Sequence, residues 1–296
     1  MKINKCFKVC YLKKLQVSLV FFFNSIRIHG IKFTDVKSSS LKDFYFNPNL
    51  EIESFKLLKG SDYETFIDIG AYFGYFSIYA KINTKIKNII AYEASPYNFK
   101  QLKKFLKLNN TDFEIVNKAV GDKKDFVKFY KPVYKGADRF PSHGQLDNPN
   151  LDPTNLYSDK TFESLETEMI PLQEIVNQKI NGSTLVKIDI EGYEEKALRS
   201  IQDYLKDTEQ VDFLIEILIN DKNKESLFNF LKSVGFNAYL LTNAGLIYEE
   251  RPLTLPKPYS DSSTGSLRTL WKDHFFTKKN TSEVNQLNKK IYKYNI

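Results

Sequence analysis

The sequence predicts an α/β fold built on a doubly wound parallel sheet. Over residues 50–120 and again over 183–242, short apolar segments alternate with amphipathic helical segments, and the links between them are short. This alternation is typical of parallel strands with helices on the faces of the sheet. In addition, the stretch FIDIGAYFGYFS (66–77) ends an apolar run in an acid and continues with two glycines four positions apart. Such sheets bind their ligands at turns of this kind, at the carboxyl ends of the strands.

Local signals support the individual elements. A glycine closes the helices expected at 50–60 and 224–236. Ser95 as N-cap and Pro96 at the first helical position open the helix expected at 95–110. Further helices are expected at 71–82 and 193–205, and strands at 65–69, 87–94, 112–120, 183–192, 211–219, 237–242 and 267–276.

Charge divides the chain into three parts: a basic N-terminal arm (1–49), a main domain (50–276) and a polar C-terminal tail (277–296), expected to be frayed or loosely helical. Residues 1–40 contain eight Lys/Arg and one acid, which accounts for the whole net charge of +7. The rest of the chain is neutral. A neutral body argues against a nucleic-acid partner, because such proteins present basic surfaces to phosphates.

The arm contains the apolar run VSLVFFF (17–23) and both cysteines, Cys6 and Cys10. Seven apolar residues are too few to span a membrane, which takes about 20. We expect an ordinary helix packed on the body, with two alternatives: a basic amphipathic segment on an anionic membrane surface, or a cleaved signal. The cysteine-free body suits the cytoplasm, and oligomeric state cannot be read from the sequence.

An irregular region interrupts the alternation at about 122–171. Its ends, KDFVKFY and ESLETEMIP, are expected to pair as strands, and the segment between them is rich in Pro, Gly, Asp and Asn. Long loops inside compact domains are commonly functional. We therefore interpret this region as an insertion or lid that faces the substrate.

The acid in the opening stretch, Asp68, distinguishes between two cofactors. A dinucleotide fingerprint needs glycine at position 72, which is Tyr72, and Asp68 would lie beside the anionic pyrophosphate of NAD. S-adenosylmethionine instead offers an ammonium and a sulfonium, which suit a carboxylate. Glu93, at the tip of the next strand, fits the ribose hydroxyls of either cofactor.

With these residues in place, the sequence resembles the FkbM family of S-adenosylmethionine-dependent methyltransferases. The resemblance covers about residues 60–245 and rests on FIDIGAYFGYFSIYA, AYEASPYNF, VNKAVGD, LVKIDIEGYEEKAL and FLIEI in this order. It implies a Rossmann-like class I methyltransferase sheet, mostly parallel with an antiparallel last strand. It also implies methyl transfer to an oxygen, commonly a hydroxyl of a sugar or polyketide. The cofactor-binding residues that it implies are Asp68, Gly70, Ala71 and Gly74 for the methionine part, Glu93 for the ribose and Ala119 for the adenine.

Transfer to a hydroxyl needs a group that accepts the proton. Asp189, at the end of its strand, is the first candidate, either as base or as the group that orients the acceptor; the alternative is a plain salt bridge with Lys187. Glu191 could bind acceptor hydroxyls or cap a helix. His143, in the insertion, is a further candidate base. Glu216 lies on a strand and needs a partner in its apolar surroundings.

We therefore expect an O-methyltransferase that acts on a hydroxyl of a small molecule or glycan, most simply a saccharide. The alternatives are an NAD-dependent oxidoreductase, an RNA ribose methyltransferase and a non-catalytic module. Asp68 disfavours the first, and the neutral body disfavours the second. A metal is not expected, because no cluster of His and Cys is present. The alternative is a divalent cation held by Asp189, Glu191 and Glu216.

Overall fold

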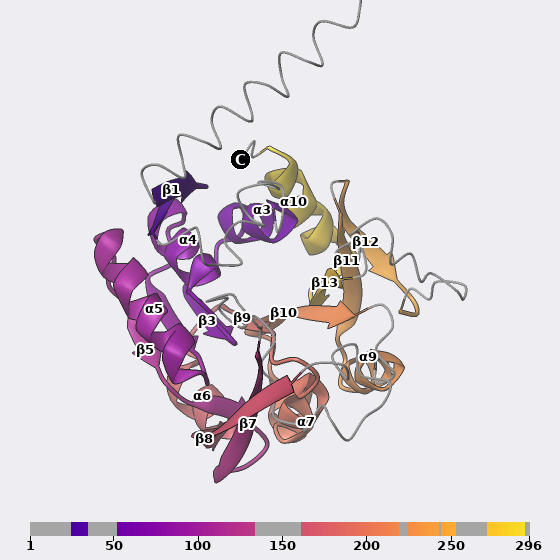
Figure 1. Cartoon of the computed structure of the whole chain (residues 1–296). Coiled ribbons are helices and arrows are strands. Elements are labelled where there is room, and N and C mark those ends of the chain that lie inside the picture. Colours follow the sequence, from indigo (N-terminus) through magenta and orange to yellow (C-terminus); the bar gives the residue numbers. More distant parts are fainter. Residues whose placement is uncertain are drawn as a thin grey trace, which may run out of the picture.

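A mixed sheet of eight strands forms the centre of the protein (Figure 1). The computed structural model describes residues 25–34, 52–133, 161–218, 224–242, 244–252 and 271–293. Across the sheet the strands lie in the order β12 (Gly245–Glu249), β11 (Asn237–Thr242), β13 (Trp271–Thr277), β10 (Val211–Leu218), β9 (Thr184–Ile188), β3 (Thr65–Ile69), β4 (Asn88–Tyr92) and β5 (Glu114–Val116). The pairs from β10 to β5 are parallel, while β13 is antiparallel to both β10 and β11. The predicted α/β class and the antiparallel last strand are confirmed.

Helices cover both faces of this sheet. On one face an apolar cluster joins the strands to α3 (Ile52–Gly60), α4 (Tyr75–Asn83), α5 (Pro96–Leu108) and α10 (Thr281–Tyr292). On the other face a second cluster joins them to α6 (Leu172–Lys179), α7 (Glu194–Arg199), α8 (Gln202–Asp207) and α9 (Lys224–Ser233). The strands between the two clusters are buried on both sides, which explains their continuous apolar runs.

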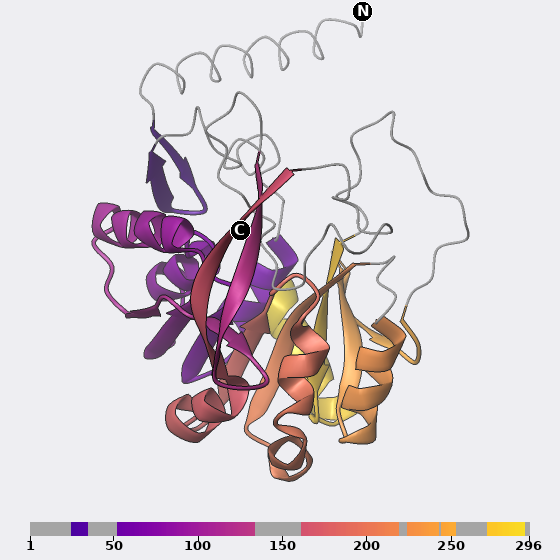
Figure 2. The ribbon, with the colours of Figure 1, turned by 60° about the horizontal axis from the view of Figure 1, so that its bottom comes forward.

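The predicted insertion supplies two strands of a second, three-stranded sheet with the order β6-β8-β7. As expected, β7 (Asp125–Val133) pairs antiparallel with β8 (Thr161–Pro171), and in Figure 2 this hairpin crosses in front of the main sheet. The strand predicted at 112–120 is divided instead: its first part is β5, and its second part is β6 (Ala119–Gly121), which pairs with β8. Between them, the Asn117 side chain donates to the carbonyls of Glu93 and Ala94, at 2.8 and 3.2 Å, which fixes the bend.

Part of the predicted arm belongs to the folded body. Residues 25–34 form a hairpin of β1 (Ser25–Ile28) and β2 (Ile31–Thr34). Ile31 and Phe33 are fully buried in the cluster that contains α4 and α5. Residues 1–24 and 35–51 lie outside the described residues, so the expectations for the apolar run at 17–23 remain predictions.

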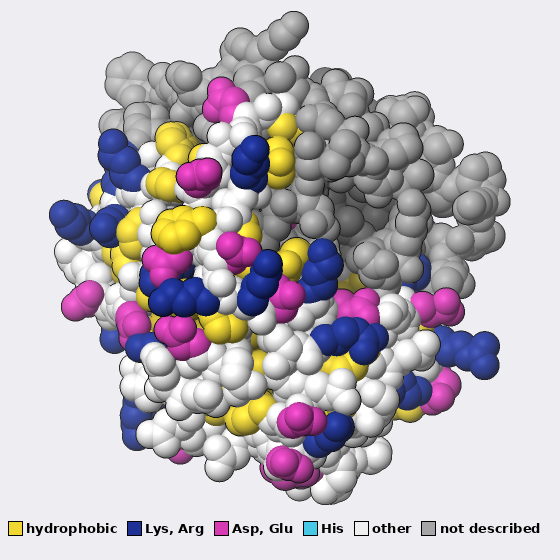
Figure 3. All heavy atoms as spheres, turned by 90° about the horizontal axis from the view of Figure 1, so that it is seen from below, with side chains coloured by type: hydrophobic (Ala, Val, Ile, Leu, Met, Phe, Trp, Pro, Cys, Tyr) yellow, Lys and Arg dark blue, Asp and Glu magenta, His cyan; other side chains and the backbone are white. Residues whose placement is uncertain are grey.

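Two features of the described residues concern nucleic-acid and membrane partners: the distribution of surface charge and the length of the helices. On the face in Figure 3, the described Lys/Arg and Asp/Glu side chains are interspersed. Within the described ranges, no helix has the length and apolar character needed to cross a bilayer.

The C-terminal segment is more regular than the sequence predicts. Instead of a loosely ordered tail, residues 281–292 form α10, which opens with a capping box between Asn280 and Glu283. Val284, Leu287 and Ile291 are buried. The helical character of the tail was expected, but its order was underestimated because the segment looks polar overall, although its apolar residues recur every three to four positions and form one face.

The contact between α3 and α10 explains Gly60, which the sequence suggests is a simple helix cap. A Cβ atom at this position would lie 3.1 Å from the backbone nitrogen of Ile291 and 3.2 Å from its Cα. The missing side chain therefore lets the two helices approach closely.

We expect Gly60→Val to lower the free energy of unfolding by about 1–3 kcal/mol, because its methyl groups would push α10 away from α3. Urea denaturation measures the change. Lys56→Val is the matched control: it places the same β-branched residue in the same helix at a partly exposed position. Equal losses in the two variants would contradict the packing role of Gly60.

Candidate active site

A short loop after β3 carries the glycines of the opening stretch. Backbone N–H groups of Gly70 and Ala71 both donate to the carbonyl of Tyr92, at 2.9 Å, and Gly74 N–H donates to the carbonyl of Ala71 at 2.7 Å. Gly70 and Gly74 have φ angles of 84° and 76°, which glycine adopts without strain. Tyr72, with φ 53°, adopts the same left-handed region at a cost. We call residues 70–74 the cofactor loop.

Gly70 also permits a close backbone contact between the cofactor loop and the end of β9. A Cβ atom here would lie 1.8 Å from the carbonyl oxygen of Asp189, a distance that no packing tolerates. The Asp189 N–H donates to the carbonyl of Ile69, at 3.0 Å. The cofactor loop and the end of β9 are therefore in direct backbone contact.

Asp68 lies in β3 just before this loop and is 1% exposed. The Ser77 hydroxyl, in the first turns of α4, donates to Asp68 Oδ2 at 2.5 Å. Burial raises the pKa of Asp68, and nearby Lys187 and the Ser77 hydrogen bond lower it in part. Within the described part of the chain, Asp68 Oδ1 is a buried oxygen without a hydrogen-bond partner. A buried carboxylate oxygen of this kind can accept from a cationic donor, as the ammonium of S-adenosylmethionine requires.

Glu93 follows β4 and is 5% exposed. Its Oε2 accepts from Tyr72 N–H at 2.8 Å, and its Oε1 accepts from Ser95 N–H at 2.9 Å and Asn98 Nδ2 at 3.2 Å. The carboxylate therefore fixes the cofactor loop against the tip of β4. A carboxylate has about four acceptor positions, so Oε2 retains capacity for a ribose hydroxyl. Ribose binding remains a prediction.

The titration of Glu93 gives a testable pH dependence of stability. Burial raises the pKa of Glu93 from 4.5 to about 7. Between these values the folded chain binds more protons than the unfolded chain, so the Glu93 contribution to stability decreases as pH rises through this window. We expect the Glu93 contribution to the free energy of unfolding to decrease by at most about 3 kcal/mol between pH 4.5 and pH 8. Urea unfolding of wild type and Glu93→Gln at both pH values measures it, and an unchanged pH dependence in the variant would contradict the expectation.

At the end of β9, Lys187 and Asp189 form an ion pair. Lys187 Nζ lies 2.8 Å from Asp189 Oδ2, and the two side chains are 4% and 29% exposed. Burial lowers the pKa of Lys187, but the carboxylates of Asp189, Asp68, Glu216 and Asp273 raise it more, so that it lies above its ordinary value. Asp189 is thus a partly exposed acid held next to the cofactor loop.

The turn after Asp189 contains Glu191, which has a left-handed φ of 56°, and Gly192, with φ 101°. Glu194 closes the turn: its two carboxylate oxygens accept from the N–H groups of Ile190 and Gly192, both at 2.9 Å. Burial raises the pKa of Glu194 to about 7. Strained backbone at non-glycine positions is common at functional sites.

The remaining candidates are placed as follows. Ala119 is buried in β6, where it pairs with Met169. Glu216 pairs with Asp273 across β10 and β13, at the same end of the sheet as the cofactor loop. His143 lies outside the described residues. In the described ranges, no three His, Cys, Asp or Glu side chains are arranged to hold a metal ion.

Two residues of the site were not predicted as such. Lys187 was considered as the partner in a strand-end salt bridge, although its position in the middle of an apolar strand signals a buried charge. Glu194 was assigned to a helix without further role. The sequence feature that could have revealed the role of Glu194 is its spacing from Gly192. An acid two residues after a turn glycine can reach back to the N–H groups of the turn.

Comparison with known proteins identifies the domain. The model of the methyltransferase FkbM domain matches residues 68–237. Among solved structures, the chain is similar to a methyltransferase FkbM from Methylobacillus flagellatus KT, with 15% identity and a TM-score of 0.42; the match covers 72% of this chain and 43% of that one. It is also similar to an O-methyltransferase from Bacillus cereus in complex with S-adenosylhomocysteine, with 12% identity and a TM-score of 0.38, over 77% and 79% of the two chains. No curated protein sequence matches the chain significantly.

Proposed function

This chain belongs to the FkbM family of S-adenosylmethionine-dependent methyltransferases, and from that premise we propose that it methylates a hydroxyl oxygen of a saccharide or similar small molecule. When bound, S-adenosylmethionine supplies a methyl group on a sulfonium, which leaves as a neutral thioether. The residues around the loop fit this cofactor. Asp68 offers a carboxylate oxygen for the ammonium, Gly70 lets the cofactor loop turn tightly against the backbone of Asp189, and Glu93 offers an acceptor to the ribose.

The position of Asp189 supports transfer to oxygen. Its backbone contacts the cofactor loop, and its carboxylate is partly exposed and ion-paired. A hydroxyl is a weak nucleophile until a neighbouring group accepts its proton or hydrogen bond, and a fixed carboxylate can do both. Most of the remaining barrier to displacement is met by alignment of the oxygen with the methyl carbon and the sulfur.

The saccharide class rests on the composition of the insertion. Its sequence offers many side chains that hydrogen-bond to hydroxyl groups: Asp138, Arg139, His143, Gln145, Asp147 and Asn148. His143 would be a second candidate base. The cysteine-free body suits a reaction in the cytoplasm.

Cofactor binding can be tested before the acceptor is known. We expect S-adenosylhomocysteine to bind wild type with micromolar affinity in calorimetry, and NAD not to bind. Asp68→Asn keeps the shape and the Ser77 contact but removes the charge, so it should weaken binding of S-adenosylmethionine at least tenfold. Binding of NAD alone would overturn the methyltransferase proposal.

The acceptor is tested with S-adenosylmethionine that carries a ¹³C-labelled methyl group and with a panel of methyl glycosides of glucose, galactose, mannose, rhamnose and glucosamine, the last of which carries an amine. The NMR shift of the transferred methyl group distinguishes an O-methyl from an N-methyl product. An O-methyl product on any glycoside supports the proposal. If only amines become methylated, the assignment to oxygen is wrong.

A further inference from the structure

Lys187 is a buried lysine in a central strand of the sheet. It lies near the end of the strands that carries the candidate active site. It lies in β9, in register with Asp68 of β3 and Leu214 of β10, and its side chain is 4% exposed. Removing an ammonium from water costs several kcal/mol unless it is well paired. An apolar residue would pack between these strands without that cost. Packing therefore does not explain a lysine at this position.

The surroundings of Lys187 are strongly acidic. Four carboxylates act on its ammonium, those of Asp189, Asp68, Glu216 and Asp273. They come from the ends of four adjacent strands, β9, β3, β10 and β13. Among the described residues, Asp189 is in direct ion-pair contact with it, at 2.8 Å. The Lys187 ammonium is thus attracted by four carboxylates, and the ion pair that it forms at short distance is with Asp189.

Lys187 also contacts the helix that follows the cofactor loop. Its Nζ lies 4.8 Å from the ring centroid of Phe76, in the first turn of α4, in the range of a cation–π interaction. Phe76 comes two residues after Gly74, the end of the cofactor loop. The ammonium therefore joins the cofactor side of the site to Asp189.

Asp189 is restrained at three points. Its N–H donates to Ile69, its carbonyl oxygen lies against Gly70, and its Oδ2 accepts from Lys187. The first two contacts fix the backbone, and the third fixes the side-chain rotation. This leaves Oδ1 available for a hydroxyl of the acceptor.

We propose that Lys187 is a positioning residue that orients the Asp189 carboxylate toward the acceptor hydroxyl, next to the cofactor loop. The inference rests on the proposed function and deepens it. Lys187 itself touches neither the methyl group nor the acceptor. It acts through Asp189. Removal of the Lys187 charge should therefore lower the methylation rate only when residue 189 carries a carboxylate.

A double-mutant cycle tests this dependence, with S-adenosylmethionine as donor and the best methyl glycoside of the panel as acceptor. We expect K187M to lower kcat at least tenfold and to change the KM for S-adenosylmethionine less than threefold. K187R, which keeps the charge, should restore most of kcat. In a D189N background, K187M should add less than twofold. Equal losses in both backgrounds, or no rescue by arginine, would overturn the proposal.

Crystal structures of wild type, K187M and K187R with S-adenosylhomocysteine give a test that needs no acceptor. Asp189 should keep its orientation in K187R and rotate away in K187M, while the cofactor loop stays in place. An unmoved Asp189 in K187M would refute the positioning role even if no glycoside is methylated. If wild type binds S-adenosylhomocysteine but methylates no glycoside, the saccharide assignment fails, and these structures still decide the role of Lys187.

Loss of Lys187 removes a buried cation that attracts four carboxylates, so K187M could fail to fold. The variant K187M/E216Q removes one positive and one negative charge and keeps the net charge of the cluster. It replaces K187M in both tests if needed, with E216Q as its control. A displaced Asp189 in K187M/E216Q but not in E216Q is expected, and the same orientation in both would overturn the proposal.

Discussion

Gly70→Ala should abolish binding of S-adenosylhomocysteine and lower the free energy of unfolding by about 4 kcal/mol or more. Two effects combine at this position. An alanine at φ 84° is strained, at about 1–2 kcal/mol. In addition, its Cβ atom would lie 1.8 Å from the carbonyl oxygen of Asp189. Because the clash is with backbone, the ends of β3 and β9 must separate, and the cofactor loop moves with them.

Gly192→Ala is the matched control for this prediction. Gly192 has a φ of 101°, so alanine is strained there too, but among the described residues no atom beyond the two chain neighbours lies within 4 Å of the Cβ position. We expect a loss of about 1–2 kcal/mol from strain alone, with binding of S-adenosylhomocysteine retained. Urea unfolding and calorimetry on both variants measure the difference. Comparable losses at the two positions would show that strain, rather than the contact with Asp189, explains Gly70.

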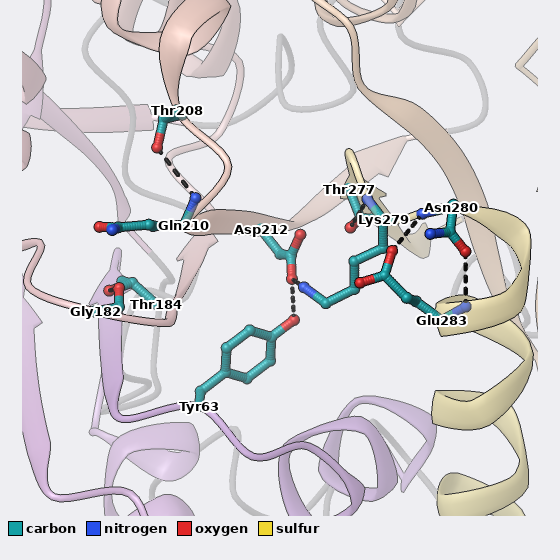
Figure 4. Close-up of polar contacts among 10 residues, drawn as sticks. All are labelled: Tyr63, Gly182, Thr184, Thr208, Gln210, Asp212, Thr277, Lys279, Asn280 and Glu283. Carbon is teal, nitrogen blue, oxygen red and sulfur yellow. Dashed lines mark hydrogen bonds and ion pairs between the residues drawn. The ribbon is translucent and has the colours of Figure 1, made fainter.

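Asp212→Ala should lower the free energy of unfolding by about 3–5 kcal/mol, although Asp212 lies at the opposite end of the strands from the candidate site. Asp212 is 2% exposed in β10 and accepts hydrogen bonds from the Tyr63 hydroxyl and from Lys279 Nζ (Figure 4). Tyr63 precedes β3, and Lys279 lies between β13 and α10. The carboxylate thus links three segments that are distant in sequence. Its loss removes the acceptor of the buried Tyr63 hydroxyl and of the Lys279 ammonium.

Two variants separate the parts of this prediction. Tyr63→Phe removes only the hydroxyl and should cost about 1–2 kcal/mol. Asp203→Ala breaks an ion pair with Lys206 in which the Asp203 side chain is 96% exposed, and we expect no measurable change. Thermal and urea unfolding of the three variants rank the effects. A loss in Asp212→Ala no greater than in Tyr63→Phe would mean that Lys279 contributes nothing.

The sequence predicts the strands and the acids at their ends because both follow from local patterns. Asp68, Glu93 and Asp189 each end an apolar run, and the parallel topology brings strand ends together at one edge. What the sequence does not reveal is pairing between distant segments. Neither the bond between Glu93 and Tyr72 nor the contact of Gly60 with Ile291 leaves a local signature, because each depends on how elements approach in space.

The hairpin of residues 25–34 was not predicted. Ile31 and Phe33 alternate over too few residues to distinguish a strand from a loop. Lys187 was judged by its neighbours in sequence, as the partner of Asp189, whereas its burial comes from β3 and β10 on either side of β9.

The strand order has a consequence for synthesis on the ribosome. Because β13 lies between β10 and β11, the sheet has a gap there until residues 271–277 have emerged. During translation, β10 and β11 would each present an open edge to other nascent chains. The sheet can therefore close only after residues 271–277 have been synthesised, and ribosome-stalled chains that stop short of β13 should be substrates for chaperones.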